Sequence, residues 1–141
     1  MRGRLLHNQR MLFLAELVAA VAGLIHVWIF VLESLWFDRP RVWARFGLKS
    51  ADEAKVVRGF AYNQGFYNLF LAVGVGMGLA LMVLARDPVL VAAGRGVTIF
   101  ACGSMAAAGI VLVASDPRFA RAAALQIVPG LSGALLLLLV G

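Results

Sequence analysis

Polar side chains are concentrated in a short block, residues 62–68, near the start of an uncharged stretch of the chain. That stretch runs from Gly59 to Ala85 and is long enough to cross a bilayer. In hydrocarbon, hydrogen-bonding side chains are costly unless each finds a partner. Amide and phenol groups both donate and accept hydrogen bonds, so we predict that this block binds a ligand inside the membrane. The predicted ligand-binding residues are Asn63, Gln64, Tyr67 and Asn68.

Two ionisable residues, His26 and Glu33, lie in the first apolar run. Their spacing of seven places them on one face of an α-helix, two turns apart. Histidine titrates near neutral pH. A carboxylate in hydrocarbon costs on the order of 3 kcal/mol, and packing alone does not require it because an apolar residue packs as well. We therefore predict that His26 and Glu33 exchange protons, in catalysis or in proton-coupled ligand movement.

The composition places these residues in a polytopic membrane protein. Of the 141 residues, 62% are hydrophobic and 14% are charged, whereas soluble domains have about 25% charged residues. The charges fall into blocks between apolar runs. We predict an all-α integral membrane protein that forms a single domain, 1–141, built as an antiparallel four-transmembrane-helix bundle. The predicted helices cover about 12–37, 59–85, 96–115 and 122–141.

The connections predict how these helices are arranged. Those at 86–95 and 116–121 are short and each contains an Asp-Pro turn signal, so successive helices run antiparallel. The long connection, 38–58, contains a capping box from Ser50 to Glu53. This box predicts a short interfacial helix that starts at about residue 51 and continues into the second span.

Counted inward from the long connection, the polar residues of different spans lie in the same half of the membrane. Glu33 lies about one turn deep and His26 about three, while residues 63–68 lie one to two turns deep. The fourth span enters from the same side with Gln126, beside a carbonyl that Pro129 frees. Gln126 therefore joins the predicted ligand-binding residues. A purely structural alternative is that these side chains bond across helices, at about 0.6 kcal/mol each.

Four motifs together resemble one family, and the resemblance covers nearly the whole chain. They are His26-Val-Trp-Ile-Phe-Val-Leu-Glu33, Asn63-Gln64-Gly65-Phe66-Tyr67-Asn68, Ala108-Gly109-Ile110 and Gln126-Ile127-Val128-Pro129. These residues resemble the small bacterial and fungal membrane proteins grouped as domain-of-unknown-function family 1304. The chain departs from the family at Gly130, where alanine is usual. The resemblance implies a four-helix membrane protein and no established activity.

Two classes of function fit these residues. The first is a module that binds or transports a small amphipathic molecule through the predicted ligand-binding residues, with His26 and Glu33 moving a proton. The alternative is an intramembrane acid/base enzyme, of isomerase or hydrolase type, in which His26 and Glu33 act on a lipid or isoprenoid-like substrate. The sequence shows no inverted repeat of the kind many transporters have. A path across the membrane would then require a homodimer.

Several other classes of site are not expected. One histidine and one glutamate fall short of the three or four ligands of a zinc site, so we expect no metal. We expect no cofactor, because phosphate-binding loops and catalytic triads are absent. The glycines from Gly74 to Gly78 lack a preceding strand, and their spacing indicates close helix packing instead.

Charge predicts the surroundings of the protein. The net charge is +6, and we attribute the basic loops to anionic membrane lipids rather than to nucleic acid. Lys and Arg are more numerous on the side of the long connection, which predicts that this side is cytoplasmic. We expect a multi-pass protein of the cell inner (plasma) membrane.

Overall fold

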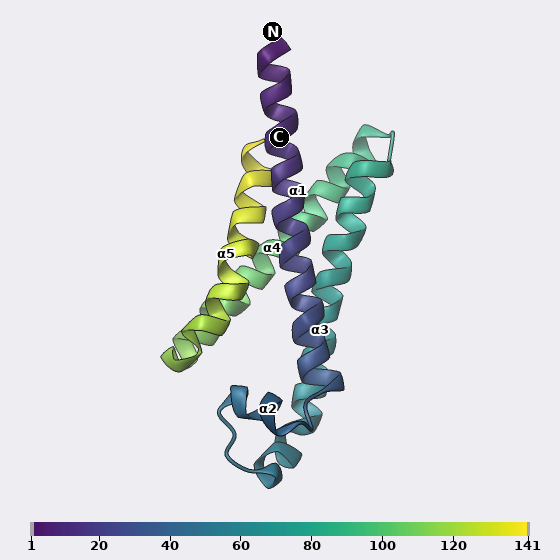
Figure 1. Ribbon diagram of the computed structural model, residues 1–141. Helices are drawn as coiled ribbons and strands as arrows, with labels where there is room; N and C mark the ends of the chain where they lie inside the picture. The colour runs from purple at the N-terminus through teal and green to yellow at the C-terminus, as the bar shows by residue number, and fades with distance from the viewer. Residues whose placement is uncertain (1, 141) are drawn as a thin grey trace. The chain divides into compact units, whose positions relative to one another are not determined.

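Helices make up most of the computed structural model, which describes residues 2–140 (Figure 1). In order they are α1 (Arg2–Phe30), the π-helical turn η1 (Val31–Leu35), α2 (Pro40–Trp43), the 3-10 turn η2 (Ala44–Phe46), α3 (Ala51–Leu84), α4 (Pro88–Ser115), the 3-10 turn η3 (Pro117–Phe119) and α5 (Ala120–Leu139). Met1 and Gly141, the ends of the predicted domain, lie outside the described residues. The segments Leu6–Leu35, Ala51–Leu84, Pro88–Ser115 and Pro117–Leu139 are each long and apolar enough to cross a membrane. The predicted fold class, all-helical with four apolar spans, is confirmed, and the chain is a multi-pass membrane protein.

The chain forms two compact units. One contains Met1–Ile25 and Leu71–Gly141, and the other contains His26–Phe70. The first unit holds α4, η3, α5, most of α1 and the last part of α3. The second unit holds the end of α1, the π turn, the long connection and the first half of α3.

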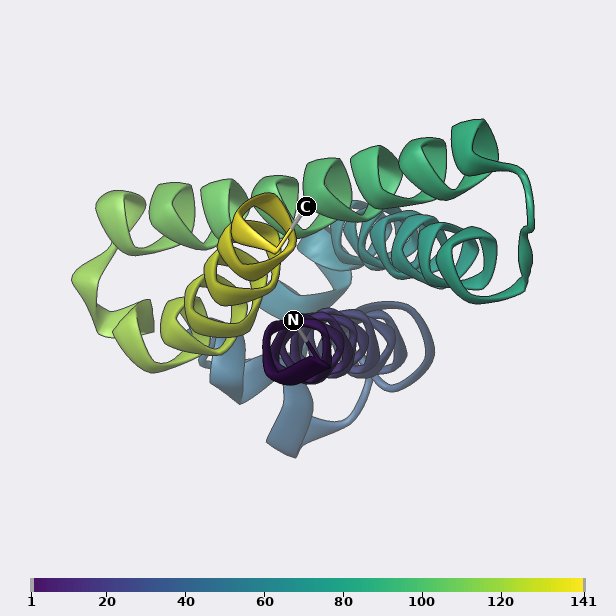
Figure 2. The ribbon, with the colours of Figure 1, turned by 90° about the horizontal axis from the view of Figure 1, so that it is seen from above.

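Small side chains fill the core of the first unit. Its buried residues are Ala15, Ala19 and Ala22 of α1, Val75 of α3, Ala101, Cys102 and Met105 of α4, and Ala134 and Leu137 of α5. Within this unit successive helices run antiparallel, and Figure 2 shows α4 beside both α5 and the last part of α3. Because small residues let helix backbones approach closely, packing between the backbones stabilises this unit.

The backbones of α3 and α4 meet at Gly78 and Gly94. A Cβ built at Gly78 would lie 2.6 Å from the Gly94 carbonyl oxygen and 3.0 Å from the Thr98 backbone nitrogen. Thr98 is completely buried, and its hydroxyl donates to the Gly94 carbonyl at 2.9 Å. Gly74, one turn earlier, faces the Ala101 methyl group at an ordinary 3.6 Å. The close helix packing predicted from the glycine spacing is confirmed.

The Gly78→Ala variant tests this contact. Overpacking destabilises a protein by about 1–3 kcal/mol, whereas the higher helix propensity of alanine stabilises it by about 1 kcal/mol. We therefore expect the free energy of unfolding to fall by about 1 kcal/mol. SDS titration in mixed micelles measures it. The matched control is Gly76→Ala, because a Cβ at Gly76 has nothing within 4 Å, and this variant should be neutral or stabilising. Equal effects of the two variants would contradict the close contact.

The later helices begin before the points predicted from the apolar runs. α4 begins at Pro88 rather than near Gly96, because the Asp87 side chain caps it, accepting from the Val89 backbone N–H at 2.7 Å. Asp116 caps η3 in the same way through the Arg118 backbone N–H, at 2.9 Å. The Arg118 side chain also donates to the Asp116 carboxylate and holds its pKa below the ordinary value. Both Asp-Pro pairs therefore start helices, and little connecting chain remains.

The long connection contains one predicted feature and one that was not predicted. At its end, Ser50 Oγ accepts from the Glu53 N–H at 3.2 Å and starts α3, which continues without a break to Leu84. The unpredicted feature is the pair of turns α2 and η2. Pro40 occupies the first turn of α2, and Gly47 ends η2 with a left-handed φ of 79°, which favours glycine.

Candidate functional site

The first helix widens into a π turn around Glu33. The Trp36 N–H donates to the Val31 carbonyl, five residues back, at 2.9 Å. π turns within helices are rare and frequently mark functional sites. The predicted shared face of His26 and Glu33 assumed a regular α-helix, and the π turn changes the angular register after Phe30.

Glu33 and Asn68 are joined by a buried hydrogen bond. The Asn68 Nδ2 donates to Glu33 Oε2 at 2.9 Å and to the Gln64 backbone carbonyl at 3.1 Å. Glu33 and Asn68 are only 9% and 7% exposed as whole residues. The structure therefore brings together one predicted residue of the first span and one of the second.

Gly65 allows α3 to reach the π turn. A Cβ built at Gly65 would overlap Ser34 Oγ and would lie 3.1 Å from both Glu33 Cβ and the Ser34 backbone nitrogen. The Ser34 hydroxyl in turn donates to the Tyr62 carbonyl at 2.9 Å. Asn68 follows Gly65 by about one helical turn, so this backbone contact sets the position of Asn68 next to Glu33.

The other predicted site residues lie in different surroundings. His26 belongs to the same unit as the Glu33–Asn68 pair and is completely buried. Asn63, Gln64 and Tyr67 occupy exposed positions of α3, and their role in ligand binding stays a prediction. Gln126 is half-buried on α5 in the first unit, and its part in a ligand site likewise stays a prediction.

An aromatic cluster lies beside the pair on α3. The Phe66 ring meets Phe30 of α1 edge-to-face at 5.1 Å and contacts Tyr62 at 5.0 Å and Phe70 at 6.2 Å between ring centroids. Such ring pairs contribute about 0.5–1.5 kcal/mol beyond their area. The Phe30–Phe66 pair joins α1 to α3 in this unit, and the other two pairs extend the cluster along α3.

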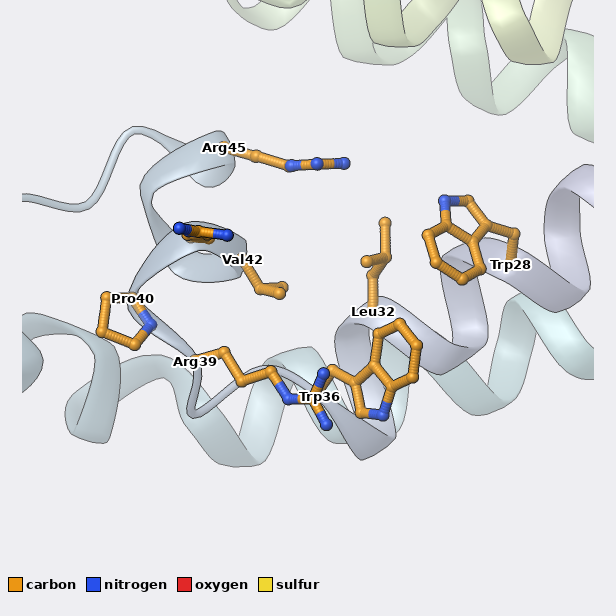
Figure 3. Close-up of a pocket in the computed structure, with 8 residues that line it drawn as sticks. Trp28, Leu32, Trp36, Arg39, Pro40, Val42 and Arg45 are labelled. Carbon is orange, nitrogen blue, oxygen red and sulfur yellow. The ribbon is translucent and has the colours of Figure 1, made fainter.

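A groove of about 480 Å³ lies between the end of α1 and the turns α2 and η2 (Figure 3). We call it the arginine groove. Its apolar wall consists of Trp28, Leu32, Trp36 and Val42, and its basic rim of Arg39, Arg41 and Arg45. In Figure 3, Leu32 points into the groove and Arg45 extends over it.

The arginine groove was not predicted, although its residues carry a sequence signal. Trp28, Leu32 and Trp36 follow one another at a spacing of four, which is one stripe of a helix. In the structure the Trp28 and Trp36 rings meet edge-to-face at 5.4 Å, and the Arg39 guanidinium carbon lies 4.3 Å from the Trp36 ring centroid. This last contact has cation–π geometry.

Comparison with protein families matches residues 20–139 to a family described as "Protein of unknown function (DUF1304)". The chain belongs to the DUF1304 family. The resemblance predicted from the motifs is therefore confirmed. Comparison of this DUF1304 chain with curated proteins and with solved structures finds no match.

Proposed function

We propose that this DUF1304 protein binds or transports a small amphipathic molecule, whose polar group contacts the Glu33–Asn68 pair. The hydrogen bond from Asn68 to Glu33, within two candidate membrane spans, supports the proposal. Placing a carboxylate inside a span is unfavourable by on the order of 3 kcal/mol, whereas one interhelical hydrogen bond stabilises helix association by about 0.6 kcal/mol. Helix association alone contributes less than this cost, which supports a ligand that uses the carboxylate.

The chemistry of the pair indicates which chemical groups the proposed ligand would carry. A carboxylate accepts up to about four hydrogen bonds, and among residues 2–140 the Asn68 amide is its side-chain partner. Acceptor positions thus remain for a hydroxyl or amine donor of the ligand. The Phe30–Phe66 aromatic pair suits an apolar part of the same molecule. In this proposal Asn63, Gln64 and Tyr67, which belong to the same unit as the pair, supply further polar contacts.

The Glu33→Gln variant tests the proposal. The protein is purified in mild detergent, and the small molecules that remain bound are identified by mass spectrometry. We expect a molecule enriched over bulk lipid in the wild type and retained about tenfold less by the variant. The reason is that a hydrogen bond to a charged group contributes about 1.5–3 kcal/mol.

The matched control is Glu16→Gln, which changes a half-buried glutamate of the same helix in the other compact unit. It should retain the molecule at the wild-type level. Equal retention by Glu33→Gln and the wild type, or no enrichment over bulk lipid in any sample, would contradict the proposal.

The alternative is acid/base catalysis on a lipid or isoprenoid-like substrate. The observation that favours it is the burial of two ionisable side chains, His26 and Glu33, in one compact unit. A proton donor and a base are what an isomerase or a hydrolase needs. Product analysis after incubation with membrane lipid extracts separates the classes, because altered lipid indicates an enzyme and unaltered bound molecule indicates a carrier.

The setting that we propose is the cell inner membrane, with the long connection on the cytoplasmic side. The basic residues of that connection and of the Asp116–Arg121 turn support this orientation. Transport, as opposed to binding, would involve a homodimer, because four helices alone make a small path.

A further inference from the structure

We propose that the arginine groove binds the headgroup of an anionic membrane phospholipid. The phosphate would contact Arg39, Arg41 and Arg45, and the first part of an acyl chain would lie on Trp28 and Leu32. This inference does not rest on the function proposed for the Glu33–Asn68 pair.

The groove changes polarity at the end of the first span. The candidate span ends at Leu35, so Trp28 and Leu32 lie inside it, while the arginines of the rim follow it. An amphiphile at a bilayer surface has the same gradient, with its tail in the apolar region and its charge at headgroup level. Tryptophan is also enriched at that level, and Trp36 lies at this junction.

The rim carries positive charge that acidic side chains do not neutralise. Among the residues whose side chains the structure describes, the basic residues with an ion pair are Arg58 with Asp38 at 2.9 Å, Lys55 with Asp52 at 3.2 Å and Arg118 with Asp116 at 2.6 Å. The three rim arginines are exposed and have no such pair within those residues. An anionic group is therefore the complementary occupant.

The geometry of the rim suits a phosphate oxygen. The Arg39 guanidinium carbon lies over the Trp36 ring, 4.3 Å from its centroid, and a guanidinium presents its N–H groups in its own plane. They form the fork that binds phosphate through two hydrogen bonds. Arg45 extends over the groove from the other side (Figure 3), so both arginines face the space in which we place the phosphate.

The apolar wall favours a phospholipid over free phosphate. A free phosphate ion gains nothing from indole and leucine side chains, and a volume of about 480 Å³ is far larger than such an ion fills. A phospholipid headgroup with its first methylene groups uses both the rim and the wall. The surrounding bilayer supplies it at high local concentration.

The test compares phosphatidylglycerol with phosphatidylcholine of the same acyl chains, added to the detergent-purified protein and counted by native mass spectrometry. We expect the wild type to retain phosphatidylglycerol about tenfold better. Arg39→Gln, Arg41→Gln and Arg45→Gln together should abolish this preference, since each basic residue near an anionic surface contributes several-fold.

The control removes the same charge outside the groove on the same predicted side of the membrane, through Lys49→Gln, Lys55→Gln and Arg121→Gln. We expect this control to keep the preference. If it loses as much as the groove variant, the attraction is diffuse and the proposed site is wrong. Glu33→Gln should also keep the preference, which separates this test from that of the proposed function.

A second readout is the quenching of tryptophan fluorescence. Phosphatidylglycerol with brominated acyl chains should quench tryptophan fluorescence more than brominated phosphatidylcholine does, and Trp28→Phe should remove most of the excess. Equal quenching by the two lipids would overturn the proposal. Displacement of phosphatidylglycerol by millimolar inorganic phosphate would assign the groove to a free anion instead.

Discussion

Replacement of Asn68 by leucine is expected to lower the free energy of unfolding by about 3 kcal/mol. The substitution removes the amide that donates to Glu33 at 2.9 Å and leaves the carboxylate of this buried residue without that partner. Breaking a buried pair by removing one member costs about 3–5 kcal/mol when the remaining group is charged, and about 1–3 kcal/mol when it is neutral. SDS titration in mixed micelles measures the change.

The reciprocal variant, Glu33→Met, is expected to cost less, about 1 kcal/mol. The Asn68 amide keeps its second acceptor, the Gln64 carbonyl at 3.1 Å, so it is not left without a hydrogen bond. The double variant should recover most of the loss of Asn68→Leu, because two apolar side chains of similar volume replace a buried polar pair at little cost. Additive losses in the double variant would contradict direct coupling.

The double-mutant cycle of Asn68→Leu and Glu33→Met also separates a structural role of the pair from a binding role. If the pair only joins two helices, the stable double variant keeps every property of the wild type. If the pair recognises a ligand, the double variant is folded and retains none of the molecule that copurifies with the wild type. We expect the second result, because the carboxylate costs more inside a span than its bond to Asn68 returns.

The four spans could be predicted from the sequence because each is a long apolar run almost free of charges, a pattern typical of helices that cross a bilayer. The start of α3 could also be predicted, because the capping box at Ser50 and Glu53 is a local signal and forms as expected. The start of α4 was misplaced by eight residues, from Gly96 to Pro88. An Asp-Pro pair fits a turn and a capped helix start alike, and the apolar residues that follow are what distinguish the two.

The hydrogen-bonded pair of Glu33 and Asn68 could be predicted from the sequence only in part. Depth counted along antiparallel helices placed Glu33 and Asn68 in the same half of the membrane, and they meet. The π turn could not be predicted, because no local pattern in residues 31–35 specifies it. It is accompanied by contacts to a distant helix, the bond from Ser34 to Tyr62 and the approach of Gly65.

The arginine groove depends on the same kind of non-local information. The stripe Trp28, Leu32, Trp36 is visible in the sequence, but it forms a wall only because α2 folds back beside it and supplies Val42. A short helix in a connection has weak local signals. Here they are Pro40 at the start of α2 and Gly47 at the end of η2, and together they indicate that the chain turns but not in which direction.

The second large effect is expected at Gly65. Gly65→Leu should lower the free energy of unfolding by about 3 kcal/mol, the upper end of the range for overpacking, because its Cβ alone would overlap Ser34 Oγ. The Ser34 backbone nitrogen and Glu33 Cβ, each 3.1 Å from that Cβ, belong to a helix and cannot move aside as a flexible side chain does. Separation of α3 from the π turn should also break the bond between Asn68 and Glu33.

Two further variants make the prediction about Gly65 specific. Gly59→Leu, on the same helix and with nothing within 4 Å of its Cβ, should be neutral or stabilising through helix propensity. Gly65→Ala should lower stability through the same Cβ contacts, and Ser34→Ala should rescue it only in part, since it removes the overlapping hydroxyl but leaves the two backbone-linked contacts. Complete rescue would show that the hydroxyl alone excludes a side chain at 65. A Gly65→Leu variant as stable as Gly59→Leu would show that α3 and the π turn do not meet there, and the placement of Asn68 beside Glu33 would fail with it.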